Sequence, residues 1–171
     1  FEHKMQVAEA MRKVAPVIIE VGKEFGKKYG REYGLFEKYK LDDAKMAIVA
    51  LGSTCGTAKV VIDELRNKGV KAGMLKLRVF RPFVAEEIVK ALGGIPAIAV
   101  LDRADSLNTQ GGPLFTEVRS ALYDNGKGPK IINYIYGLGG RDITLDDLHS
   151  VFSDLKQIDK KPLVNYLGVR E

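Results

Sequence analysis

The sequence predicts an α/β fold built on a parallel sheet, and residues 47–65 give the strongest indication of it. Residues 48–51 form an unbroken apolar run with β-branched members, which is typical of a strand covered on both faces. A glycine-containing turn follows at residues 52–57. Apolar residues then recur at helical spacing, at Ala58, Val61, Ile62 and Leu65. A strand, a tight turn and a crossover helix in this order form the basic unit of a parallel sheet.

The N-terminal segment predicts a long helix over residues 2–28. Its apolar residues alternate by four and three positions, at Val7, Met11, Val14, Ile18, Val21 and Phe25. At 1.5 Å per residue this helix would be roughly 40 Å long, and Pro16 should kink it. Two interpretations stay open. The helix either lies across its own domain or forms an arm that packs on another domain or subunit.

Further elements follow from apolar runs separated by turn residues. Residues 29–34 break the first helix, and residues 35–40 predict a short edge strand. Ser53 or Thr54 is expected to cap the helix after the turn, and Gly69 to end it. Three more strands are predicted at residues 74–80, 95–101 and 131–136.

Helices are expected between and after these strands. Residues 84–92 form a short helix that ends at a glycine pair, and Pro113 suits the first position of the next helix. A turn is expected at residues 124–129. Thr144 is expected to cap the last helix, and the residues after 156 form a tail with an apolar patch. We therefore divide the chain into a connector helix and turn (1–34), an α/β domain (35–156) and a C-terminal tail (157–171).

Composition limits the classes of function. The 171-residue chain has 46% hydrophobic residues, a net charge of +5 and one cysteine. One cysteine excludes an iron–sulfur cluster or a cysteine-ligated zinc site built by this chain alone. The basic residues alternate with acidic ones, so nucleic-acid binding is not expected. No apolar run is long enough to cross a membrane, and we expect a cytoplasmic protein.

The loops after the predicted strands should share one edge of the sheet, since parallel strands all end on the same side. This places the turn at residues 52–57 beside three other loops. We expect Arg81, Arg103, Asp105, Arg141 and Asp142 in these loops to act as loop clamps or interface residues. Ion pairs that hold loops are a more common role for such residues than acid–base catalysis.

The turn itself offers a candidate anion site, formed by Gly52, Ser53, Thr54, Gly56 and Thr57. Its amides would point outward at a helix N-terminus. It lacks the lysine of a P-loop and the GxGxxG pattern of dinucleotide folds, so a plain strand-to-helix turn is the alternative. Cys55 is expected to be a small buried residue, and a thiol with a lowered pKa near the helix start is the alternative. His3 and His149 lack metal-ligand spacing, and the residues predict neither a metal site nor a catalytic group.

Three stretches together resemble one enzyme family. They are ALGSTCGTAKVVIDELRNKGVKAGMLKLRVFRPF, VLDRADSLNTQGGPLFTEVRSALY and GLGGRDIT. They are similar to the C-terminal part of the alpha subunit of pyruvate:ferredoxin oxidoreductase, also called pyruvate synthase. The resemblance covers roughly residue 29 to the end of the chain.

The resemblance implies a fold and a function. The fold is the transketolase C-terminal-like domain, a three-layer α/β/α sandwich whose five-stranded sheet has one antiparallel edge strand, for which residues 35–40 are the candidate. The family converts pyruvate, coenzyme A and oxidised ferredoxin to acetyl-CoA and carbon dioxide. It uses thiamine diphosphate, magnesium and iron–sulfur clusters, none of which this chain is expected to bind. The partners implied are the other domains and subunits of an oligomeric complex, with ferredoxin at the level of the complex.

Two functions from different classes remain open at this stage. The first is a domain of a thiamine-dependent oxidoreductase that makes subunit contacts and is inactive alone. The second is a self-contained module that binds a small molecule or anion at the carboxyl edge of its sheet. The oxoacid of the parent enzyme is also open between pyruvate, 2-oxoglutarate and branched-chain or aryl 2-oxoacids.

Overall fold

A six-stranded sheet forms the centre of the structure, a computed structural model that describes residues 1–123 and 128–170. The strand order is β1-β3-β2-β4-β5-β6, and β1 is antiparallel to β3 while every other pairing is parallel. The strands are β1 (Phe36–Tyr39), β2 (Met46–Leu51), β3 (Ala72–Leu77), β4 (Ala97–Asp102), β5 (Lys130–Ile135) and β6 (Val164–Tyr166). The predicted α/β fold with an antiparallel edge strand at residues 35–40 is confirmed.

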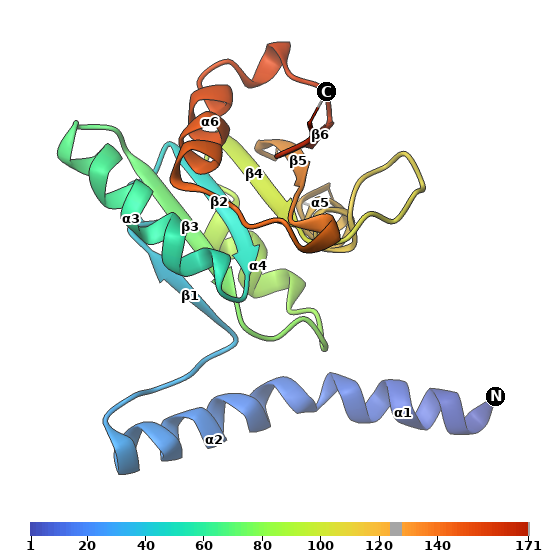
Figure 1. Ribbon diagram of the computed structural model, residues 1–171. Coiled ribbons are helices and arrows are strands. Elements are labelled where there is room, and N and C mark those ends of the chain that lie inside the picture. The colour runs from blue at the N-terminus through green and yellow to red at the C-terminus, as the bar shows by residue number, and fades with distance from the viewer. Residues whose placement is uncertain (124–127, 171) are drawn as a thin grey trace.

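Helices cover both faces of the sheet, as Figure 1 shows. Helices α3 (Thr54–Asn67) and α6 (Leu145–Leu155) pack on one face, around buried residues such as Ile48, Ile62 and Phe152. Helices α4 (Ala85–Leu92) and α5 (Pro113–Tyr123) pack on the other, around Val49, Ile98 and Phe115. Two hydrophobic cores on opposite faces of one sheet make the predicted three-layer sandwich. Two short 3₁₀ helices, η1 (Leu138–Gly140) and η2 (Ile158–Lys160), lie in the connections around α6.

The expected number of five strands is wrong, because β6 adds a sixth. It lies in the segment predicted to be a tail and pairs in parallel with β5. The Asn133 amide donates to the Leu163 carbonyl at 2.8 Å, and the Leu167 amide to the Ile135 carbonyl at 2.9 Å. These bonds satisfy an edge of β5 that would otherwise be open. A three-residue strand next to Pro162 is too short to show a period-two pattern in the sequence. The three-part division of the chain stays a prediction.

The ends of several elements differ from expectation for identifiable reasons. Strand β3 ends at Leu77 because the next two amides, of Arg78 and Val79, both donate to the Leu35 carbonyl at 3.0 Å. The N-terminus of α6 has the expected cap. The Thr144 side chain accepts from the Asp147 amide and the Asp147 side chain accepts from the Thr144 amide. Part of the turn expected at residues 124–129 lies outside the described residues.

The expected side-chain cap of α3 is not formed. Ser53 occupies the N-cap position with helical backbone angles (φ −69°, ψ −32°) and makes no side-chain cap bond. In that conformation its hydroxyl is not directed at the first amides of the helix, because an N-cap side chain acts from an extended backbone. Thr54 directs its hydroxyl elsewhere, to Tyr136.

The N-terminal segment forms two helices, α1 (Glu2–Arg12) and α2 (Val14–Tyr29), instead of one. The break falls at Lys13 (φ −91°, ψ −4°), three residues before Pro16. A proline disturbs the helix one turn earlier, since its ring clashes with the carbonyl four residues before it and it donates no hydrogen bond. Pro16 itself lies in the first turn of α2, where prolines are tolerated. Helix α1 has no buried residue, and it extends away from the sheet in Figure 1.

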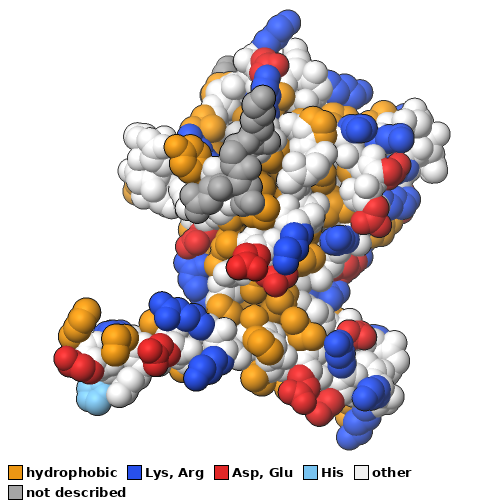
Figure 2. All heavy atoms as spheres, turned by 180° about the vertical axis from the view of Figure 1, so that it is seen from behind, with side chains coloured by type: hydrophobic (Ala, Val, Ile, Leu, Met, Phe, Trp, Pro, Cys, Tyr) orange, Lys and Arg blue, Asp and Glu red, His pale blue; other side chains and the backbone are white. Residues whose placement is uncertain are grey.

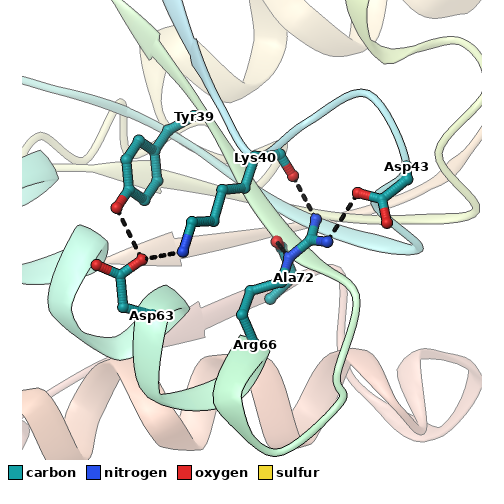
Figure 3. Close-up of polar contacts among 6 residues, drawn as sticks. All are labelled: Tyr39, Lys40, Asp43, Asp63, Arg66 and Ala72. Atoms are coloured by element: carbon teal, nitrogen blue, oxygen red, sulfur yellow. Dashed lines mark hydrogen bonds and ion pairs between the residues drawn. The ribbon is translucent and has the colours of Figure 1, made fainter.

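A polar network holds the β1–β2 connection against α3 (Figure 3). The Arg66 side chain donates from Nε to the Ala72 carbonyl at 2.6 Å, from one terminal nitrogen to Asp43 at 2.7 Å, and from the other to the Lys40 carbonyl. Nearby, the Tyr39 hydroxyl donates to Asp63 at 2.7 Å, and Lys40 contacts the same carboxylate oxygen. Arg66 thus ties three segments of the chain together at the edge of the sheet.

Candidate functional site

Strand order places a topological switch point between β2 and β4. These neighbours are parallel, but the chain leaves β2 for α3 on one face and leaves β4 for α5 on the other. The two loops diverge and leave a crevice beyond the carboxyl ends of the strands. In open α/β sheets, ligands bind preferentially at such a point.

A pocket of about 220 Å³ lies at this edge, on the side of α3. Its lining comes from the loops after β2, β4 and β5. The lining residues are Ser53, Thr54, Thr57, Arg103, Tyr136, Arg141, Asp142 and Ile143. The fold therefore brings most of the predicted anion turn together with two of the three predicted arginines.

A buried hydroxyl pair connects the turn to the end of β5. The Thr54 and Tyr136 hydroxyl oxygens are 2.7 Å apart, and both side chains are almost fully buried. Burial raises the pKa of the Tyr136 phenol, so it stays neutral and serves as a hydrogen-bonding group. The pair fixes the floor of the pocket. Tyr136 was not among the predicted site residues.

The two pocket arginines hold loop carbonyls. The Arg103 Nε donates to the Gly137 carbonyl at 3.2 Å, and Arg141 donates to the Gly168 carbonyl beyond β6. Both side chains are exposed. Within the described residues, no ion pair joins either arginine to Asp105 or Asp142. The expected contacts between the loops are thus made to backbone oxygens.

The other predicted residues lie outside the pocket. Arg81 binds Glu117 of α5 at 2.6 Å, and Asp105 accepts from the Leu107 amide and the Tyr166 hydroxyl, both at 2.8 Å. Gly52 has φ +70°, a conformation that favours glycine and allows the chain to turn from β2 into α3. Gly56 follows in the first turn of that helix.

A buried polar cluster supports the edge from beneath, and sequence reasoning missed it. The carboxylate of Asp102 accepts from the Leu114 amide at 2.8 Å and from the Phe115 amide at 3.0 Å. The Asn133 side chain donates to the same carboxylate at 2.9 Å and accepts from the Gly112 amide at 2.8 Å. Burial raises the pKa of Asp102, and these hydrogen bonds oppose the shift. The available signal was an asparagine inside the apolar run of β5, since a buried amide needs partners.

The only cysteine of the chain is structural. Cys55 is fully buried in the core under α3, as expected. Burial raises the pKa of its thiol, which lowers the fraction of reactive thiolate. The chain thus offers no exposed thiol next to the pocket.

The chain's single cysteine does not fit an iron–sulfur cluster, and the described residues hold no group of three or more metal-ligating side chains. One buried thiol falls short of the set of thiolates that holds an iron–sulfur cluster. Over residues 1–123 and 128–170, no three His, Cys, Asp or Glu side chains gather in a metal-binding group.

Two further features concern the rest of the surface. A larger pocket of about 640 Å³ lies at the opposite edge of the sheet, near the starts of β2, β4 and β5. Gly128, Pro129 and Lys130 are among its described lining residues. None of the helices in the described residues has the length and hydrophobicity that a membrane crossing requires.

Comparison with known proteins identifies close relatives. The family model for the pyruvate:ferredoxin oxidoreductase core domain II matches residues 44–148. The pyruvate synthase subunit PorA of Thermotoga maritima is 44% identical over 100% of this chain and 44% of its own length. The ketoisovalerate oxidoreductase subunit VorA of Pyrococcus abyssi is 43% identical over 92% of this chain and 40% of its own length. The chain thus spans less than half of the curated relatives that it matches.

Solved structures support the fold alone. A split-gene transketolase, described as an inactive tetramer of beta subunits, superposes with a TM-score of 0.54 at 18% identity. The superposition covers 72% of this chain and 42% of the transketolase chain. The predicted likeness to a transketolase domain is confirmed at the level of the fold.

Proposed function

The chain belongs to the pyruvate:ferredoxin oxidoreductase core domain II family, and on that premise we propose that it works as a domain of the alpha subunit of a 2-oxoacid:ferredoxin oxidoreductase. The observation that carries the proposal is the 44% identity to a pyruvate synthase subunit over the whole chain. We propose pyruvate as the oxoacid, with oxidation to acetyl-CoA and transfer of electrons to ferredoxin. A branched-chain oxoacid is the second candidate, because a ketoisovalerate oxidoreductase subunit is 43% identical.

In this proposal the domain contributes contacts and not catalytic groups. Thiamine diphosphate, magnesium and the iron–sulfur clusters would be held by other domains and subunits. Apolar side chains on α1 and α2 support a contact role, because they are exposed where a neighbour could cover them. Met5, Val7, Val17 and Val21 are each more than half exposed. Exposed apolar residues gathered on one segment commonly mark interaction surfaces.

The proposal is tested by assaying the purified chain and then mixing it with the remaining subunits of a complete enzyme. With pyruvate, coenzyme A, thiamine diphosphate, magnesium and a viologen acceptor, we expect no reduction by the chain alone. A complete pyruvate synthase under the same conditions is the positive control. Sedimentation should show that the chain joins the other subunits in a larger complex. Turnover by the pure chain, or a strict monomer that binds none of them, would contradict the proposal.

A further inference from the structure

The pocket beyond β2, β4 and β5 has the chemistry of a small oxyanion site. Two arginines from different loops line it, Arg103 after β4 and Arg141 after β5. The hydroxyl-bearing side chains of Ser53 and Thr57 line the same pocket. We propose that it binds a phosphate group, either as inorganic phosphate or as a small phosphate monoester.

Donor capacity supports this ligand. An arginine has five N–H donors in a planar fork that matches the oxygens of phosphate. The described contacts of Arg103 and Arg141 within the site use one nitrogen of each side chain, for a loop carbonyl. These carbonyl contacts hold both side chains in place and leave the other nitrogens for a ligand. The site is therefore organised before an anion arrives, which reduces the entropy that binding costs.

The location and the size of the pocket narrow the choice of ligand further. Ser53 and Thr57 follow β2 and Arg103 follows β4, so the pocket spans the switch point between these strands. Its volume of about 220 Å³ is below that of sites for larger organic ligands, which measure roughly 300–1,000 Å³. A phosphate or a small monoester suits this size.

One carboxylate opposes the proposed ligand. Asp142 lines the pocket beside the two arginines and reduces the net side-chain charge there to +1. Its removal should therefore strengthen anion binding, whereas removal of either arginine should weaken it. If these residues were only structural, removing the carboxylate and removing an arginine would not change the anion affinity in opposite directions.

Calorimetric titration of the purified chain with sodium phosphate at low ionic strength tests the proposal, with sodium chloride of equal ionic strength as the reference. We expect saturable binding that Arg103→Ala weakens by about tenfold or more, the range for loss of a charged hydrogen bond. Arg103→Lys should lose less, because it keeps the charge. Arg81→Ala is the matched control, since Arg81 lies at the same edge but pairs with Glu117 outside the pocket. It should change the affinity by less than about twofold.

A second series uses Asp142→Asn and compares inorganic phosphate with glycerol phosphate. Asp142→Asn should raise the affinity for the anion that binds. The anion with the higher affinity for the wild-type chain, inorganic phosphate or glycerol phosphate, identifies the form of phosphate that the site takes. The proposal is overturned if neither anion binds above the chloride reference. It is also overturned if Arg103→Ala and Arg81→Ala weaken binding equally, or if Asp142→Asn weakens it. None of these three outcomes affects the assignment to the oxidoreductase family, because that assignment is tested with the other subunits.

Discussion

Asp102 is a buried residue whose carboxylate accepts three hydrogen bonds. Its carboxylate lies at the N-terminus of α5, where the first amides of a helix lack partners within the helix. The Asp102 carboxylate accepts hydrogen bonds from the Leu114 and Phe115 amides. The Asn133 side chain accepts from the Gly112 amide, and Pro113 has no amide hydrogen to donate. The negative charge also favours this end of the helix dipole. Every donor at the start of α5 up to Phe115 is therefore paired.

Asp102→Asn tests this role. An asparagine would direct an NH₂ group at a backbone donor and leave that buried amide unpaired, at a cost of roughly 1–3 kcal/mol. We expect the free energy of unfolding, measured with urea, to fall by that amount. Asp42→Asn is the control, since the Asp42 side chain is 94% exposed and should change stability by less than about 0.5 kcal/mol. Equal effects of the two variants would show that the carboxylate of Asp102 is not needed.

At the residue scale, the sequence predicted the loops of the site better than their contacts. Arg103, Arg141 and the turn after β2 were placed at one edge because parallel strands end together. The contact between Thr54 and Tyr136 spans 82 positions in the chain, and no local pattern reports such a pair. Arg81 follows a strand of the same edge, yet binds Glu117 on the other face. Strand order predicts which edge a residue reaches, and side-chain packing then decides its partner.

Strand β1 is an edge element that relies on one acidic side chain. Glu37 accepts from Lys59 of α3 and from Arg78 after β3, the latter at 2.7 Å. Its side chain is 24% exposed, so the contacts are partly shielded from solvent. The hydrogen bond from Lys59 lowers the pKa of Glu37, and the nearby positive charges add to this effect. The edge strand is thereby attached to both of its neighbours.

Glu37→Gln is expected to lower stability at neutral pH by about 1 kcal/mol, after allowance for partial exposure. Because the folded-state pKa lies below the unfolded value, the contribution is complete above the ordinary pKa of 4.5 and is lost as the pH falls through the lowered pKa. The difference between wild type and variant should thus shrink on acidification. Urea unfolding over a series of pH values measures it, with Glu9→Gln on exposed α1 as control. A difference that is constant or grows toward acid would contradict the ion-pair explanation.

At the element scale, the sequence predicted the helices and five of the six strands, including the four-residue β1, and missed only the shortest strand, β6. The helix expected to begin at Pro113 is formed as α5, and its apolar side chains Leu114, Val118 and Leu122 are buried. Strand β6 has only three residues, and its pairing with β5 depends on where the chain returns after α6. The sequence predicted a kink at Pro16, whereas the helix breaks at Lys13. A proline disturbs the carbonyl four residues before it, so the break falls one turn earlier than the proline itself.

The attachment of the N-terminal helices determines the shape of the whole molecule. Figure 2 shows hydrophobic side chains between these helices and the rest of the protein. A groove of about 440 Å³ runs there, lined by Val17, Val21 and Phe25 of α2 and by Tyr33 and Val79. Gly22 is the one buried residue of α2, and it lies against the backbone of Tyr33. The chain thus folds back on α2 where that helix has no side chain.

Gly22→Ala should loosen α2 without disturbing the sheet. A Cβ at this position would lie 1.9 Å from the Tyr33 carbonyl oxygen, and backbone atoms must move to accept it. The matched control is Gly56→Ala in α3, where a Cβ meets nothing within 4 Å. Alanine favours a helix over glycine by roughly 0.5–1 kcal/mol, so propensity alone would slow amide exchange in both variants. We expect Gly22→Ala instead to speed exchange over residues 14–29 by about tenfold, equal to about 1.4 kcal/mol of local stability, with unchanged exchange in β2 and β4. Hydrogen–deuterium exchange with mass spectrometry measures both regions at once. Slower exchange in α2 of the Gly22 variant would mean that the contact with Tyr33 does not hold the helix. Its attachment would then depend only on the apolar side chains that line the groove.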